Sequence, residues 1–207
     1  MPFNQKPQKF NASINTVEIG CGDKAIKLGG ECTFPFYTFD APMENAPKIG
    51  VEVSDLGIAS NIPGIQKFYE GASTIGEIAK KAETMEGADF VCLRLEGGDP
   101  NGADKSIDEL IEVVKEVADA VTCPLVVEGC KNVEKRYRTA SEGCRKFFRV
   151  KNALVMSARE ENYKAVGAAA GLAYNQKVGA ESAVDINLAK QLKRCYDSAW
   201  GKKLRIS

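Results

Sequence analysis

Short apolar runs alternate with longer segments of helical spacing over most of the chain, from Pro47 onward. Five of these runs are predicted to be β-strands, at residues 49–53, 90–95, 125–129, 153–157 and, more weakly, 177–181. The third and fourth runs are nearly continuous in apolar residues, which is typical of parallel strands covered on both faces. Strands that alternate with helices in this way indicate repeated β/α units around one parallel sheet.

The clearest helical periodicity lies between Ser106 and Val121. Its apolar residues form one stripe and its Glu and Lys residues lie opposite, as in an amphipathic helix that packs on a sheet. Ser106 is predicted to cap this helix with Glu109 as its capping-box partner, and Pro124 is expected to end it. Further helices are predicted at residues 74–86, 133–148, 161–173 and 187–200.

Residues 1–46 differ from the rest because they are richer in polar and turn residues. Residues 16–20 and 25–29 alternate around a glycine-containing turn, which predicts an N-terminal β-hairpin. The aromatic segment 34–39 is expected to plug one end of the sheet rather than to stack on a ligand. We therefore divide the chain into a hairpin and aromatic segment, 1–46, and a β/α region, 47–207, that forms either an open sheet or an unfinished barrel.

The composition removes several classes of function. The 207 residues include 28 Lys and Arg, 28 Asp and Glu, and no histidine, with 44% apolar residues. A net charge of zero gives no field that would attract nucleic acid or an anionic membrane surface, so neither is predicted as a partner. Without histidine, Ser-His-Asp and Cys-His catalysis and histidine-containing zinc sites are excluded.

Cysteine spacing and hydropathy add two further expectations. The seven cysteines stand at wide, irregular spacings without a C-x-x-C pair, so no iron–sulfur cluster or other metal site is predicted on this chain. The first 20 residues lack the apolar core of a secretory signal, and no run of about 18 apolar residues occurs anywhere. We therefore expect a cytoplasmic protein with reduced thiols.

In parallel α/β folds, ligands gather at the carboxyl ends of the strands. The loop 97–102 follows the second strand and contains Asp99 and Asn101; its glycines could let the backbone approach a polar ligand, or simply form a long turn. Glu96 and Glu128 stand at strand ends, where they could act as general bases or merely meet solvent.

Three asparagines, Asn132, Asn162 and Asn187, lie just beyond successive strands and near the starts of the following helices. They could cap those helices. They could also donate hydrogen bonds to a planar heterocycle or to the amide fringe of a large cofactor, and one residue can do both.

Several short motifs occur in an order that resembles a known family. They are Gly29–Glu31, Pro35–Tyr37, Glu52–Asp55, Gly87–Asp89, Leu95–Ala103, Pro124–Cys130, Asn132–Lys135, Glu161–Lys164 and Asp185–Leu192. Together they resemble the small, or delta, subunit of the corrinoid iron–sulfur protein of acetyl-CoA decarbonylase/synthase systems. The resemblance covers nearly all of residues 14–192.

The resemblance implies a TIM barrel similar to pterin-dependent methyltransferases, with about five of its eight β/α units present here. It implies a large subunit as partner, which carries the four-iron cluster and a cobalamin domain, so that the corrinoid is shared between the two chains. A methyl group would pass from a methyl-tetrahydropterin or methyltetrahydrofolate through cobalt to acetyl-CoA synthase. Pterin methyltransferase and acetyl-CoA synthase would then be transient partners of a chain with no catalytic residue of its own.

On this resemblance, the residues expected to face the corrinoid are Asp99, Asn101, Asn132, Asn162 and Asn187. The chain departs from the family beyond Asn187, where its tail is short and different, so a shortened copy that is poorly soluble or dimeric is expected. Three alternatives stay open: a pterin-dependent methyltransferase, an aldolase-like enzyme with Lys131 or Lys164 as a Schiff-base amine, and a truncated copy without function.

Overall fold

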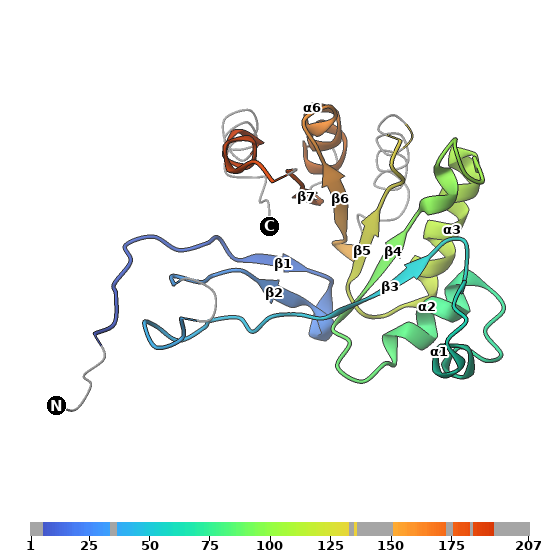
Figure 1. Ribbon diagram of the computed structural model, residues 1–207, viewed down its shortest axis with the longest axis horizontal. Coiled ribbons are helices and arrows are strands. Elements are labelled where there is room, and N and C mark those ends of the chain that lie inside the picture. Colours follow the sequence, from blue (N-terminus) through green and yellow to red (C-terminus); the bar gives the residue numbers. More distant parts are fainter. Residues whose placement is uncertain are drawn as a thin grey trace.

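A parallel five-stranded sheet forms the centre of the molecule (Figure 1). The computed structural model describes residues 6–33, 37–132, 135, 151–172, 176–182 and 184–192. The strands are β3 (Gly50–Ser54), β4 (Phe90–Arg94), β5 (Leu125–Glu128), β6 (Leu154–Ala158) and β7 (Lys177–Ala180), in that spatial order. All five predicted strands are therefore confirmed to within about a residue or two at each end, and they are parallel.

Strands that follow one another in the sequence are neighbours in the sheet. Residues at their ends are in register, so that Ser54 pairs with Arg94 and Arg94 pairs with Glu128. At the other end of the sheet Gly50 pairs with Phe90, and a Cβ on Gly50 would lie 2.2 Å from the Phe90 ring. Among the described strands, β3 and β7 are the two edges, so the structure confirms the α/β class but not a closed barrel.

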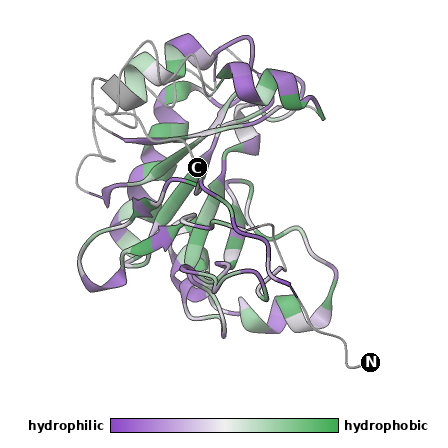
Figure 2. Cartoon of the chain, turned by 90° about the vertical axis from the view of Figure 1, so that its left-hand side faces the viewer, coloured by the Kyte–Doolittle hydropathy of each residue, from purple (hydrophilic) through white to green (hydrophobic). Residues whose placement is uncertain are grey.

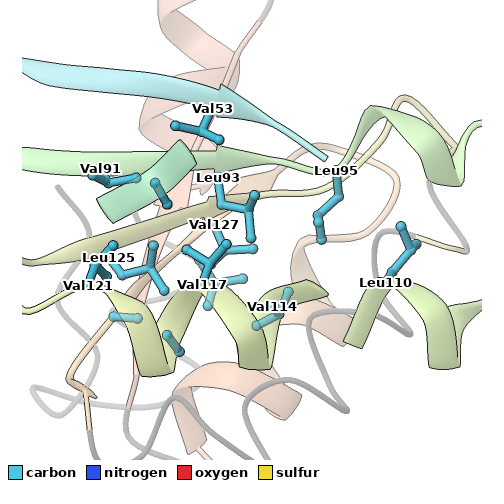
Figure 3. Packing of buried hydrophobic residues seen from close by; sticks show 14 of the residues in the cluster. Val53, Val91, Leu93, Leu95, Leu110, Val114, Val117, Val121, Leu125 and Val127 are labelled. Carbon is cyan, nitrogen blue, oxygen red and sulfur yellow. The ribbon is translucent and has the colours of Figure 1, made fainter. Parts of the chain in front are cut away.

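One face of the sheet packs against helices α2 (Ile75–Glu83) and α3 (Ile107–Ala120). Figure 3 shows strand residues such as Val91, Leu93 and Val127 meeting Val114 and Val117 from α3. These residues alternate along each strand, as expected for a sheet with two distinct faces. Figure 2 shows the strands coloured mainly as hydrophobic, with hydrophilic residues spread over the helices and loops outside them.

Helix starts follow their local sequence. Ser106 and Glu109 form the predicted capping box of α3, and Thr74 and Glu77 form another at the start of α2. A short helix, α1 (Pro63–Phe68), was not predicted; it begins with a proline, which suits the first turn of a helix.

The opposite face of the sheet is covered at its amino-terminal end by the predicted hairpin, β1 (Val17–Ile19) and β2 (Ile26–Leu28), with the one-turn 3-10 helix η1 (Gly22–Lys24) between them (Figure 1). Val17 and Ile19 are buried against Val126 and Leu154. The hairpin therefore covers this end of the sheet. Tyr37 and Phe39 are each 48% exposed, which corrects the expectation for these two rings.

The remaining predicted helices are described in part. The helix predicted at 161–173 is present as α6 (Tyr163–Val166), followed by a π-helical turn, η4 (Gly167–Leu172). Residues 186–192 are helical, while the rest of the segment 187–200 and almost all of 133–148 lie outside the described residues. Within the described residues, no helix is long and apolar enough to cross a membrane.

Candidate functional site

A cavity of about 190 Å³ opens at the carboxyl ends of β4, β5 and β6. Its lining combines three cationic side chains with three acidic ones and a short stretch of loop: Arg94, Glu96, Asp99, Glu128, Gly129, Cys130, Lys131 and Arg159. The cavity thus lies where the sequence places a ligand site in a parallel sheet. We call this set of residues the rim.

The alternation of side chains along the strands explains why charge gathers here. Phe90, Cys92 and Arg94 occupy alternate positions of β4, on the face opposite the helices, and Phe90 and Cys92 pack in the apolar cluster beneath the hairpin. On β5, Val126 and Glu128 repeat the same change from apolar to charged. This face of the sheet is therefore apolar where the hairpin covers it and charged at the rim.

Arg94 is held at the rim by two carboxylates. Its Nη1 lies 3.3 Å from Glu52 Oε1, and its Nε lies 3.3 Å from Glu96 Oε1. Ser54 Oγ donates a hydrogen bond of 3.0 Å to the other oxygen of Glu96. Partial burial disfavours the charged guanidinium, but Glu52 and Glu96 outweigh this and raise the pKa of Arg94. Arg94 is therefore a positively charged side chain held in place by two carboxylates. The contacts with Arg94 and Ser54 hold the Glu96 side chain in place.

Of the five residues expected to face the corrinoid, Asp99 lines the cavity directly, as do Glu96 and Glu128, the two candidate general bases. Its Oδ1 accepts a hydrogen bond of 2.9 Å from the Asn101 backbone N–H and a longer one of 3.4 Å from the Asn101 side chain. Asn101 is exposed, and it does not line the cavity. The structure therefore brings Asp99 to the rim and leaves Asn101 at the tip of the loop.

The three asparagines have different places. Asn132 Oδ1 accepts from the Lys135 backbone N–H at 2.9 Å, as a capping residue does. Asn162 is buried beside the rim, and its Oδ1 accepts from the Arg159 backbone N–H at 2.7 Å. Within the described part of the chain, Asn162 Nδ2 has no hydrogen-bond partner, which leaves one buried donor next to Arg159.

Asn187 lies apart from the rim and is exposed. Its backbone N–H donates to Asp185 Oδ1 at 2.7 Å, so Asp185 and not Asn187 caps the helix at 186–192. A second cavity of about 190 Å³ lies nearby, between Arg159, Glu181 and Leu188. Arg159 borders both cavities, and its Nη2 and Nε lie 2.7 and 3.1 Å from Glu181 Oε2.

Neither candidate lysine lies in a desolvated site. Lys131 lines the rim but is exposed, and Lys164 is exposed with its Nζ 5.8 Å from the centre of the Tyr163 ring. A reactive lysine requires a desolvated site or a neighbouring cation that favours the neutral amine. The solvent-facing position of both side chains argues against this chemistry.

Two observations bear on metal and thiol chemistry in the described residues. No group of three or more Cys, Asp or Glu side chains in them is placed to hold a metal ion. Burial, followed by the nearby carboxylates Glu128 and Glu52, raises the pKa of Cys92 to about 12. This thiol therefore stays protonated and is not a nucleophile at neutral pH.

Sequence reasoning singled out neither Arg94 nor Arg159 as a site residue. A signal for Arg94 does exist, because it stands two residues after Cys92 and four after Phe90, on the same face of a strand. Arg159 directly follows β6, at the carboxyl end of the strand where ligand sites are expected, but its contact with Glu181 becomes visible only when β6 is placed beside β7.

Comparison with known proteins gives one consistent result. Residues 16–203 match the model of the CO dehydrogenase/acetyl-CoA synthase delta subunit family. An acetyl-CoA decarbonylase/synthase complex subunit delta 2 from Methanosarcina acetivorans is 32% identical over 181 residues, which is 84% of this chain and 40% of that protein. Subunit delta from Methanothermobacter thermautotrophicus is 30% identical over 205 residues, or 93% of this chain and 49% of that protein. Subunit delta from Archaeoglobus fulgidus is 36% identical over 117 residues, which is 56% of this chain and 26% of that protein. The chain thus spans at most about half the length of these relatives.

Proposed function

The chain belongs to the CO dehydrogenase/acetyl-CoA synthase delta subunit family, and from this we propose that it supports the corrinoid of a methyl-transfer protein in an acetyl-CoA decarbonylase/synthase complex. The rim is the observation that carries the proposal. It offers an open, charge-balanced set of hydrogen-bond donors and acceptors at the carboxyl ends of three neighbouring strands.

The chemistry of the rim fits the periphery of a corrinoid. A corrin ring carries amide arms, each with a donor and an acceptor, and the rim presents three cationic donors and three carboxylate acceptors. The unpartnered Nδ2 of Asn162 adds a buried amide donor beside it in the described residues. When bound, the corrinoid would supply the cobalt that carries a methyl group, while the residues of this chain hold and orient its edge.

The size of the cavity favours a supporting role over an autonomous one. Its volume of about 190 Å³ is below the roughly 300–1,000 Å³ of pockets that enclose a small molecule. It can take one or two amide arms but not the macrocycle. Most of the corrinoid surface would therefore be covered by another chain, for which the corrinoid iron–sulfur subunit is the proposed partner.

The further details of the proposal follow from the family. The methyl group would come from a methyl-tetrahydropterin or methyltetrahydrofolate and go to acetyl-CoA synthase, with the methyltransferase and the synthase as transient partners. We also propose that residues 1–46 form an extension and that β3 to β7 are part of a TIM-type barrel. Exposed apolar residues at the edges of the sheet, Ile49 and Leu56 near β3 and Ile186 beyond β7, support closure by further strands.

Cobalamin uptake tests the proposed function. We would mix hydroxocobalamin with the purified chain, with the proposed corrinoid iron–sulfur subunit, and with both together, and follow absorbance through gel filtration. The proposal predicts that the two chains elute together with cobalamin and that this chain alone retains none. Methyltetrahydrofolate-dependent methylation of free cobalamin by this chain alone would instead establish the enzyme alternative and overturn the proposal.

A further inference from the structure

Asp55 is a buried carboxylate directly after β3 that the rim itself does not use. Its side chain is fully buried, yet both of its oxygens have partners. Oδ1 accepts a hydrogen bond of 2.8 Å from the Gly97 backbone N–H, and Oδ2 forms an ion pair of 3.1 Å with Lys105 Nζ. Lys105 Nζ also donates to the Asp55 backbone oxygen at 2.9 Å. A buried charge with this degree of pairing indicates a specific structural requirement.

The two partners of Asp55 stand at the two ends of one loop. The Lys105 backbone N–H donates to the Gly97 oxygen at 2.8 Å, which closes the loop 97–105 into a ring. Inside the ring, the backbone oxygen of Asp99 accepts from Gly102 at 2.9 Å and from Asp104 at 3.1 Å. The carboxylate of Asp55 therefore holds the base of the loop that carries Asp99 to the rim.

The fit between Asp55 and the loop leaves no spare room. A Cβ on Gly97 would lie 2.4 Å from Asp55 Oδ2 and 2.8 Å from Lys105 Cδ, so no other residue fits at position 97 without displacing the pair. Such close contact lets a change at Asp55 move the loop backbone directly, because packed groups shift together.

We propose that Asp55 and Lys105 are positioning residues, which set the place of Asp99 at the rim and so the affinity of the rim for the corrinoid periphery. This inference rests on the proposed function. The pair acts through the loop and touches no ligand itself, because neither side chain lines the cavity. The loop is thereby built before any ligand arrives, which lowers the ordering cost of binding.

Amide hydrogen exchange tests the structural half of the proposal in the full chain. The variants are Asp55→Asn, which keeps an acceptor for Gly97 but loses the charge, and Lys105→Met, which keeps the apolar stem. The control is Asp89→Asn, which removes the 3.1 Å ion pair with Lys48 at the other end of the sheet. We expect exchange within residues 97–105 to rise about tenfold in both variants and to stay unchanged in the control. Unchanged exchange in both variants would overturn the proposal.

A second pair of variants keeps the test valid if Asp55→Asn folds poorly. Gly97→Ala should loosen the same loop in the wild-type background, because its methyl group meets the Asp55 carboxylate. In the Asp55→Ala background the contact with the carboxylate is gone and only the contact with the flexible Lys105 stem remains, so Gly97→Ala should add less exchange than it does in the wild-type background. Fully additive effects of the two substitutions would show that Asp55 does not act on the loop through Gly97.

The functional half of the proposal concerns the affinity for the corrinoid. We would measure it by titrating hydroxocobalamin into the complex of this chain with the proposed corrinoid iron–sulfur subunit and following the absorbance. We expect the apparent affinity to fall about tenfold for Asp55→Asn and Lys105→Met and to be unchanged for Asp89→Asn. If the wild-type complex binds no hydroxocobalamin, the proposed function is wrong, whereas the exchange result stands. If the wild-type complex binds it and the loosened variants bind it equally well, the proposed function survives and the positioning role is wrong.

Discussion

Glu83, at the end of α2, shows how one residue can join three parts of the chain. Its side chain is only 6% exposed, and its carboxylate lies 2.9 Å from Lys24 Nζ of the hairpin and 2.9 Å from Lys80 Nζ of its own helix. Thr122 donates to it from both its backbone and its hydroxyl, and the Cys123 N–H donates at 2.9 Å. Burial opposes ionisation, but these hydrogen bonds outweigh it and lower the pKa of Glu83 to about 2.

This lowered pKa predicts a stability that depends on pH. The ordinary value is 4.5, so the contribution of Glu83 is fully present above that pH and is lost as the pH falls toward about 2. We expect Glu83→Gln to lower the free energy of unfolding by roughly 2–3 kcal/mol at neutral pH, with a difference that shrinks steadily below about pH 5. Urea denaturation across this range measures it. The matched control is the exposed Glu86→Gln; an equal loss in both variants, or a loss that does not vary with pH, would contradict the prediction.

At the scale of elements, local patterns carried enough information for most of the fold. The parallel strands follow from continuous apolar runs, and the start of α3 follows from Ser106 and Glu109, because both signals lie within a few adjacent residues. The helix α1 was not predicted because it has only six residues. The apolar residue just before it, Ile62, is exposed, so the sequence shows no clear apolar stripe there. The π-helical turn in η4 was missed because its run of alanine and glycine has no polar face to set a period.

The candidate site could be predicted only in part for a related reason. Asp99 was expected at the site because it lies in the loop after β4 and inside a motif that resembles the family, and both signals are local in the sequence. The Asp55–Lys105 pair joins residues 50 positions apart in the chain, and the ion pair of Arg94 with Glu52 joins residues 42 apart. Such contacts depend on strand register, and register is a property of the folded sheet.

The packing of the hairpin on the sheet leads to a prediction about the stability of the protein. Ile19 is fully buried against the sheet, whereas Ile14, just before the hairpin, is 57% exposed. We expect Ile19→Ala to lower the free energy of unfolding by about 2–4 kcal/mol and Ile14→Ala to change it by less than about 0.5 kcal/mol. Chemical denaturation compares the two. A small effect at Ile19 would mean that the hairpin is not part of the cooperative core.

At the scale of the whole molecule, the edge of the sheet at β3 is open within the described part of the chain and carries exposed apolar residues. In the described residues β3 pairs with β4 alone, and a groove of about 450 Å³ runs beside it between β3 and α1. Leu56 and Ile62 border this region and are 53% and 60% exposed. Open apolar strand edges favour association with other chains.

This edge predicts the solution behaviour of the isolated chain. We expect sedimentation velocity to show concentration-dependent self-association, and the double variant Leu56→Lys/Ile62→Lys to reduce it with little change in melting temperature, since both side chains are largely exposed. The control for added charge is Gln66→Lys, a substitution at an exposed position of α1. A wild-type chain that stays monomeric at all concentrations would refute the prediction.

The hairpin also determines the direction from which this molecule can be approached. Val17 and Ile19 cover the amino-terminal end of the sheet face whose carboxyl end carries the rim, so the hairpin blocks access to that face from its amino-terminal end. A ligand that reaches the rim along this face must therefore enter from the carboxyl-terminal side or across an open edge of the sheet.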